Sequence, residues 1–201
     1  MEEKFKMRDI FNRLVGLKVK RNGIKELMAY LTTTDFYQAP CSRNHHLNVK
    51  GGLVTHSLNV YEAMEHMALS HDLKVDGESR ALTSLFHDLC KMDYYVEGTR
   101  NVKNERTNQW EKKMVWNIKD KFPMGHGEKS LAILYRFMAL TEAEALAVRW
   151  HMGPWGFSAS SYSLDDAIKL TPLVGALILA DQEATFFMDG KVKGKGGEKK
   201  P

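Results

Sequence analysis

The longest apolar run in the chain, LVGALILA at 173–180, leads directly into a carboxylate, Asp181. The run is apolar on every face of a helix, which predicts a helix that is buried on all sides. It is well short of the roughly 20 residues that span a bilayer, so we expect it to lie in a protein core. A carboxylate there needs a cation, a metal ion or several donors. A buried ion pair, or a turn that faces solvent, would also account for Asp181.

Apolar residues recur at helical spacing along most of the chain. An early helix is marked by Ile24, Leu27, Met28 and Leu31, and further helices are expected at about 53–70, 79–95, 128–140, 142–151, 165–170 and 172–188. The segment 97–121 is polar, and its large side chains occupy alternate positions, which predicts a small β-hairpin. The sequence therefore predicts an all-α fold, a helical bundle with a β-hairpin inserted at about 97–121.

The composition is typical of a globular protein that buries its own core. The chain has 201 residues, of which 43% are hydrophobic and 27% charged, and this suits one domain at 1–190. The net charge of +4 is accounted for by the tail 191–201, which holds five lysines and one glutamate and is expected to be disordered. A body without net charge argues against a dedicated nucleic-acid-binding domain.

Two features bear on where the protein works. The first ten residues mix charges and have no apolar stretch, so they do not resemble a signal peptide. Cys41 and Cys90 are isolated and have no disulfide-framework spacing, which favours reduced thiols. We therefore expect a cytoplasmic protein with no membrane association.

Three polar residues stand inside predicted helices. His56 lies among apolar positions, where a histidine is more often a satisfied core residue than a ligand. The adjacent His87 and Asp88 fall opposite the apolar stripe of their helix, which favours an ordinary solvated face. The alternative is a polar face that lines a pocket, where imidazole and carboxylate hold one metal ion together.

Further histidines stand at expected helix ends. His126 lies between two glycines just ahead of a helix, and His151 lies at a helix C-terminus before a Met-Gly-Pro sequence. The helix dipole alone favours a histidine at a C-terminal end. The remaining His66 and His71 are assigned to surface or core.

Five sequence segments, considered together, favour metal-ligand roles over structural roles for these residues. They are GGLVTHSLNV, LFHDLCK, GHGEKS, RWHMG and ILADQEA. In this order, over about residues 35–190, they resemble the HD-domain superfamily of metal-dependent phosphohydrolases, especially its small phage and bacterial hydrolases. The resemblance implies an HD-like fold with the metal-site region at about 40–188. It also implies six ligands for one or two divalent ions: His56, His87, Asp88 and Asp181 for the first ion, with His126 and His151 added in the two-metal branch.

Imidazole and carboxylate ligands suit Mn, Fe, Ni, Co, Zn or Mg without choosing among them, and neither cysteine belongs to the implied set. The implied reaction is attack on phosphorus by a metal-activated hydroxide, with Asp88 and Lys91 as the catalytic residues. Lys91 would contact the phosphate as a point charge; the alternative is a solvated lysine at a helix end.

Three residues are candidates for binding the rest of the substrate. Arg43 and His46 precede the first metal helix and would contact the ester or the leaving group, or they are ordinary polar loop residues. Trp155 follows His151 in a loop rich in Gly and Pro and would stack on a base. The expected substrate is a phosphate mono- or diester, such as a nucleotide.

Other functions remain open at this point. The segment 97–121 has seven Lys/Arg against four Asp/Glu, and the tail is rich in lysine, as in an exonuclease that holds single-stranded nucleic acid electrostatically. An HD fold used as a non-catalytic regulatory or binding module is a third hypothesis, and a di-iron oxygenase is a fourth. The sequence does not determine the oligomeric state.

Overall fold

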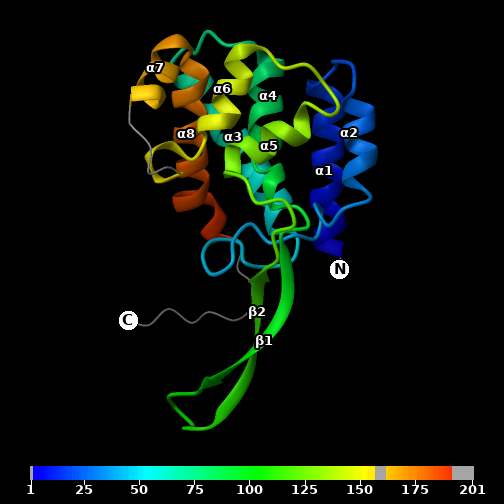
Figure 1. Ribbon diagram of the computed structural model, residues 1–201, viewed down its shortest axis with the longest axis vertical. Coiled ribbons are helices and arrows are strands. Elements are labelled where there is room, and N and C mark those ends of the chain that lie inside the picture. The colour runs from blue at the N-terminus through cyan, green and yellow to red at the C-terminus, as the bar shows by residue number, and fades with distance from the viewer. Residues whose placement is uncertain (1, 157–161, 192–201) are drawn as a thin grey trace.

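The computed structural model describes residues 2–156 and 162–191, and these ranges are mostly helical (Figure 1). Helices α1 and α2 lie together at one side of the body, α3 and α4 run through its middle, and α7 and α8 lie at the opposite side. The helices are α1 (Glu2–Lys18), α2 (Ile24–Leu31), α3 (Gly52–Ser70), α4 (Gly77–Phe86), α5 (His126–Leu134), α6 (Glu142–Trp150), α7 (Tyr162–Leu170) and α8 (Pro172–Glu183).

Short helical turns follow three of these helices. The 3-10 turns η1 (Leu89–Lys91) and η2 (Gly153–Gly156) come soon after α4 and α6. A π-helical stretch, η3 (Ala184–Met188), continues α8 and passes into the 3-10 turn η4 (Asp189–Lys191). These irregular ends are important because several buried polar side chains lie in or next to them: His87, Asp88, Lys91, His151 and Asp189.

The two strands form the expected hairpin, which projects away from the helical body (Figure 1). Strand β1 (Tyr95–Lys103) pairs antiparallel with β2 (Trp110–Ile118). Trp116, near the base, is 8% exposed and donates its Nε1–H to the carbonyl of Asn48 at 2.8 Å, whereas Trp110 is 70% exposed. The predicted hairpin is therefore confirmed, with somewhat earlier bounds.

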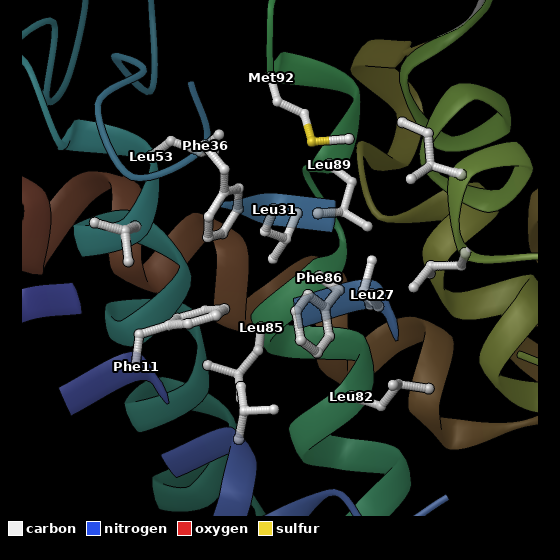
Figure 2. Packing of buried hydrophobic residues seen from close by; sticks show 14 of the residues in the cluster. Phe11, Leu27, Leu31, Phe36, Leu53, Leu82, Leu85, Phe86, Leu89 and Met92 are labelled. Atoms are coloured by element: carbon white, nitrogen blue, oxygen red, sulfur yellow. The ribbon is translucent and has the colours of Figure 1, made fainter. Parts of the chain in front are cut away.

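The described residues form two apolar core clusters, and α3 contributes to both. One cluster joins α1, α2 and α4 and contains Phe11, Leu27, Leu82 and Phe86, all fully buried (Figure 2). The other joins α3 to α6, α7 and α8. Because α3 lies between the two clusters, the polar residues His56 and Ser57 on its inner side are held inside the molecule.

The apolar run 173–180 forms most of α8, which begins at Pro172 after the cap residue Thr171. Leu173 and Leu177 are fully buried. The prediction that α8 is buried on every face is wrong at Leu179. This residue is 59% exposed, because no described element covers that side of the helix. Among the described residues, no helix is both long and apolar enough to cross a bilayer.

Several predicted bounds need correction. α1 was not predicted, because its charged sequence has a weak apolar stripe. The helix expected at 79–95 ends at Phe86, and a 3-10 turn follows in which the amide of Lys91 donates to the carbonyl of Asp88. The helix expected at 128–140 ends at Leu134. The tail prediction concerns residues that lie almost wholly outside the described ranges.

Candidate metal centre

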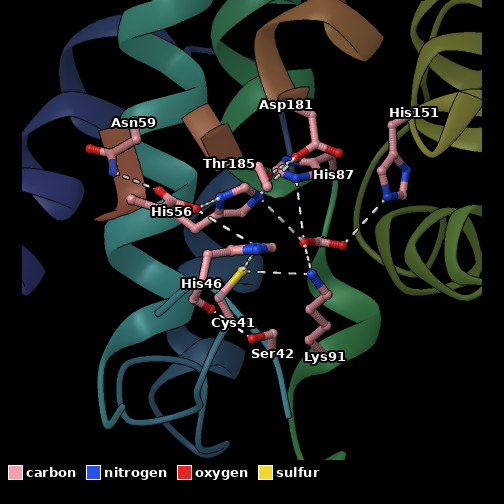
Figure 3. Close-up of polar contacts among 12 residues, drawn as sticks. Cys41, Ser42, His46, His56, Asn59, His87, Lys91, His151, Asp181 and Thr185 are labelled. Carbon is pink, nitrogen blue, oxygen red and sulfur yellow. Dashed lines mark hydrogen bonds and ion pairs between the residues drawn. The ribbon is translucent and has the colours of Figure 1, made fainter. Parts of the chain in front are cut away.

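Polar side chains from four helical segments meet in the interior of the bundle (Figure 3). His56 comes from α3, His87 and Asp88 from the turn after α4, His151 from the end of α6, and Asp181 from α8. None of the five is more than 7% exposed. The solvated face predicted for His87 and Asp88 is therefore wrong, because that side of α4 is covered as well: Thr83 and Ser84, on the same face, are fully buried.

The two carboxylates face the same imidazole rings. Asp88 Oδ2 lies 3.4 Å from His87 Nε2 and 3.7 Å from His56 Nε2, and Asp88 Oδ1 lies 3.4 Å from His151 Nε2. Asp181 Oδ1 lies 3.2 Å from His56 Nε2. These separations are typical of neighbouring ligand atoms around a single ion, and overlapping groups of these residues have the spacing to hold one.

The backbone fixes which nitrogen of two rings carries the proton. Nδ1 of His87 lies 2.8 Å from the carbonyl oxygen of Ser84, and Nδ1 of His151 lies 2.8 Å from that of Val148. A carbonyl only accepts, so each Nδ1 carries a proton, and a ring that gives up its other proton offers the lone pair of Nε2 to a metal ion. Both Nε2 atoms are buried, and neither has a hydrogen-bond partner in the described structure. Such atoms are rare, and here both point at Asp88.

His56 is held by a carboxylate at each ring nitrogen. Its Nδ1 lies 2.8 Å from Oδ2 of Asp189, whose Oδ1 accepts a hydrogen bond from Asn59 Nδ2 at 2.8 Å. Asp181 faces Nε2 from two turns earlier in the same helical segment, on the other side of η3. π-Helical stretches are frequent at functional sites. The sequence did not single out Asp189; its only signal was the spacing of eight residues from Asp181.

Lys91 lies inside the cluster and not in solvent. It is 9% exposed, and its Nζ lies 2.5 Å from Asp88 Oδ2. Burial acts to raise the pKa of Asp88, but the charges of Lys91 and His87 outweigh it and hold that pKa well below the usual range. Burial likewise acts to lower the pKa of Lys91, but Asp88 and Cys41 raise it well above its ordinary value. The alternative of a solvated lysine is therefore wrong.

The pKa values of two histidines in the cluster, His56 and His151, are raised, so that protons on these rings offset the negative charge of the carboxylates. Burial opposes the charged form of His56, but the Cys41 thiolate and the hydrogen bonds to Asp181 and Asp189 raise its pKa well above its usual value. Burial also acts to lower the pKa of His151, and Asp88 outweighs it, so the net shift is upward. A divalent cation that binds here replaces such protons.

His126 contacts Cys90, which in turn contacts Asp88 of the cluster. It is partly buried at the start of α5, and its Nδ1 lies 3.5 Å from Cys90 Sγ, which is 3.7 Å from Asp88 Oδ1. Gly127 makes this position possible, because a Cβ there would lie 2.1 Å from the carbonyl oxygen of Arg149. The three side chains Asp88, Cys90 and His126 have the spacing to hold an ion, although the sequence assigned no ligand role to either cysteine.

Of the three predicted substrate-binding residues, His46 lies at the cluster and Arg43 lies away from it. His46 joins the cluster: its Nε2 lies 3.3 Å from Cys41 Sγ, and its ring centre lies 5.3 Å from that of His56. Arg43 is exposed at the base of the hairpin, where its Nε donates to the carbonyl of Trp116 at 3.2 Å. The side chain of Trp155 lies outside the described residues.

Cys41, like Asp189 and Cys90, was not singled out by the sequence as a candidate ligand. It is fully buried beside His46 and Lys91, with Lys91 Nζ 3.6 Å from its Sγ. Burial acts to raise the pKa of this thiol, but the positive charges of His56 and Lys91 outweigh it and lower the pKa to about 7. No protein family, curated protein or solved structure was found to match this chain.

Proposed function

We propose that this chain is a divalent-metal-dependent phosphohydrolase with an HD-domain-like fold, acting on a phosphate mono- or diester such as a nucleotide. The observation that carries the proposal is the pair of buried Nε2 atoms of His87 and His151, which make no hydrogen bond in the described structure and each lie 3.4 Å from a carboxylate oxygen of Asp88. The order of the five sequence strings from GGLVTHSLNV to ILADQEA supports the same family and the same reaction.

The donor set suits a divalent ion of the Mn, Fe, Co, Ni or Zn type. His56, His87, Asp88 and Asp181 would hold it, and His151 and His126 would serve a second ion that shares Asp88. Such an ion supplies Lewis acidity toward a phosphoryl oxygen and a source of nucleophile at neutral pH. With none of the first four more than 7% exposed, the site limits the bulk water that could weaken these interactions.

The chain itself supplies the groups that orient the reaction. Asp88 faces three imidazoles and one ammonium, so its two oxygens fix the positions of ligands on both sides. Lys91 carries its charge in a buried position, where a compact ammonium with three donors can bind a phosphate oxygen and offset its negative charge. Asp189 holds the ring of His56 through Nδ1, which leaves Nε2 directed at the centre.

The direct test measures hydrolysis of nucleotide monoesters and diesters by the purified protein with Mn²⁺, Co²⁺, Ni²⁺, Zn²⁺ or Mg²⁺. Activity should depend on the metal and be lost in His87→Gln, whereas His66→Gln, an exposed histidine on α3, is the matched control. No hydrolysis across the metal and substrate panel would refute the proposal. A protein without metal or hydrolysis would instead be a non-catalytic HD-fold module.

A second candidate, an exonuclease acting on single-stranded nucleic acid, is favoured by the hairpin. Arg100 lies directly opposite Lys113 across the two strands, and both are exposed. Like charges in this position destabilise a strand pair, and a polyanion would relieve the repulsion. The exposed Trp110 could stack on a base. Oligonucleotide binding should weaken steeply with salt, less so in an Arg100→Gln/Lys113→Gln variant. Failure to bind at low salt would exclude this function.

A further inference from the structure

A second group of ligand-type side chains adjoins the Asp88 centre through His56: Cys41, His46 and Asp189 lie within reach of one ion together with that histidine. Figure 3 shows Cys41 and His46 beside His56. Cys41 Sγ lies 3.3 Å from His46 Nε2, which is 3.7 Å from Asp189 Oδ2. Tetrahedral zinc, with bonds of about 2.3 Å to sulfur and about 2.0–2.1 Å to nitrogen, separates neighbouring ligand atoms by about 3.5 Å. The two distances to His46 Nε2 are therefore close to the spacing around a bound ion, and the ligand atoms of the group all lie within 4.8 Å of one another.

The backbone around Cys41 holds two of these side chains together before any ion binds. The amide of Cys41 donates to the carbonyl of Leu47 at 3.1 Å, and Ser42 Oγ donates to the carbonyl of His46 at 2.7 Å. Gly52, at the start of α3, packs on the same loop: a Cβ there would lie 2.0 Å from Leu47 O and 2.9 Å from the amide nitrogen of Cys41. The loop is thus closed on itself and fixed against α3.

Burial and charge are those of a site that is enclosed but can be reached. Cys41 and the side chain of Asp189 are 0% exposed, whereas the side chain of His46 is 21% exposed and provides a route for an ion. A thiolate and a carboxylate together offset the charge of a divalent cation. Asp189 Oδ2 also accepts a hydrogen bond from His56 Nδ1, so this carboxylate is shared with the Asp88 centre.

We propose that Cys41, His46 and Asp189 bind a thiophilic divalent cation of the Zn²⁺ class, at a position separate from the Asp88 centre. Soft thiolate and imidazole ligands select Zn²⁺, Co²⁺ or Cd²⁺, whereas Mg²⁺ and Mn²⁺ prefer oxygen. Because the ion and His56 compete for Asp189, occupation of this site weakens the hold on His56 at the neighbouring centre. The binding itself does not depend on hydrolysis.

The test is a titration of the purified protein with Co²⁺, followed by the near-ultraviolet charge-transfer band of a thiolate–cobalt bond. The chain has two cysteines, both buried, so Cys90→Ser is the matched control for Cys41→Ser. The band should appear in the wild type and in Cys90→Ser and be absent in Cys41→Ser. Circular dichroism should show that both variants are folded.

A third variant changes a partly exposed ligand, so that its effect on Co²⁺ binding is not confused with a loss of folding. His46 is partly exposed, so His46→Gln should fold normally. It should weaken Co²⁺ binding by at least about 10- to 100-fold, since removing only a hydrogen-bond partner of a ligand already costs that much.

Three outcomes would overturn the proposal: no band in the wild type, unchanged affinity in His46→Gln, or a band lost in Cys90→Ser but kept in Cys41→Ser. The last would place the thiolate ligand with Asp88 and His126. A cobalt band that follows Cys41 in a protein without phosphohydrolase activity would support this site while refuting the proposed function. The two proposals therefore fail separately.

Discussion

The substitution Asp189→Asn tests whether His56 is held as a ligand. Both oxygens of Asp189 accept, one from His56 Nδ1 and one from Asn59 Nδ2, each at 2.8 Å. An asparagine has the same shape but only one oxygen, and its NH₂ group faces whichever donor the oxygen does not serve. Either His56 or Asn59 must then lose its acceptor, and His56 also loses the negative charge beside its ring.

The size of the effect follows from the role of that hydrogen bond. Loss of the group that orients a ligand histidine typically weakens metal binding by about 10- to 100-fold, which corresponds to about 1.4–2.8 kcal/mol. We expect the affinity of the Asp88 centre for Mn²⁺ to fall by this amount in Asp189→Asn. Mn²⁺ is the appropriate probe because it prefers oxygen and nitrogen ligands over the Cys41 thiol.

Electron paramagnetic resonance of free Mn²⁺ measures this affinity without any assay of activity. The matched control is Asp166→Asn on α7, whose side chain is 70% exposed, because it removes the same charge far from the cluster's hydrogen bonds. Equal Mn²⁺ affinity in Asp189→Asn and the wild type would refute the role assigned to Asp189 and, with it, the orientation of His56 as a ligand.

Two further predictions concern packing and pH. Gly127→Ala should lower the free energy of unfolding by about 1–3 kcal/mol, because the added Cβ would lie 2.1 Å from the carbonyl oxygen of Arg149. The control is Gly16→Ala in α1, where an added Cβ has no atom within 4 Å and should stabilise the protein slightly. Denaturant unfolding measures both, and equal effects would contradict the packing argument. The affinity for Mn²⁺ should rise with pH through the raised pKa values of His56 and His151, since both must lose a proton to bind; calorimetry across a pH series that finds constant affinity would refute this.

The helical framework could be predicted because periodic burial governs it. The stripe from Ile24 to Leu31 and the apolar run 173–180 bury their side chains in the two core clusters, and alternation across 110–118 indicated the hairpin. Periodicity failed at His87 and Asp88 because it assumes that a polar helix face is solvated, whereas Thr83 and Ser84 on that face are fully buried. There the chain changes to a 3-10 turn, with Ser130 Oγ accepting from the amide of Cys90.

The composition of the cluster was only partly accessible from the sequence. His56 and Asp181 are separated by more than a hundred residues, and no local pattern brings them together; the order of the strings suggested it. Cys41 and Asp189 lie in an irregular loop and beyond a π-helical stretch, where side-chain directions depend on tertiary contacts rather than on a repeat. Their place beside His56 follows from the packing of α3 and α8.

The central claim is that Asp88 lies at the middle of a metal centre, and metal content measured by mass spectrometry tests it most directly. To leave out any ion bound at Cys41, the comparison is made in a Cys41→Ser background, which should carry one or two divalent ions, and adding Asp88→Ala should remove them together with phosphate-ester hydrolysis. His66→Ala, exposed on α3, should keep both. A folded Asp88→Ala variant that retains its metal, or a His66→Ala variant that loses it, would contradict this account.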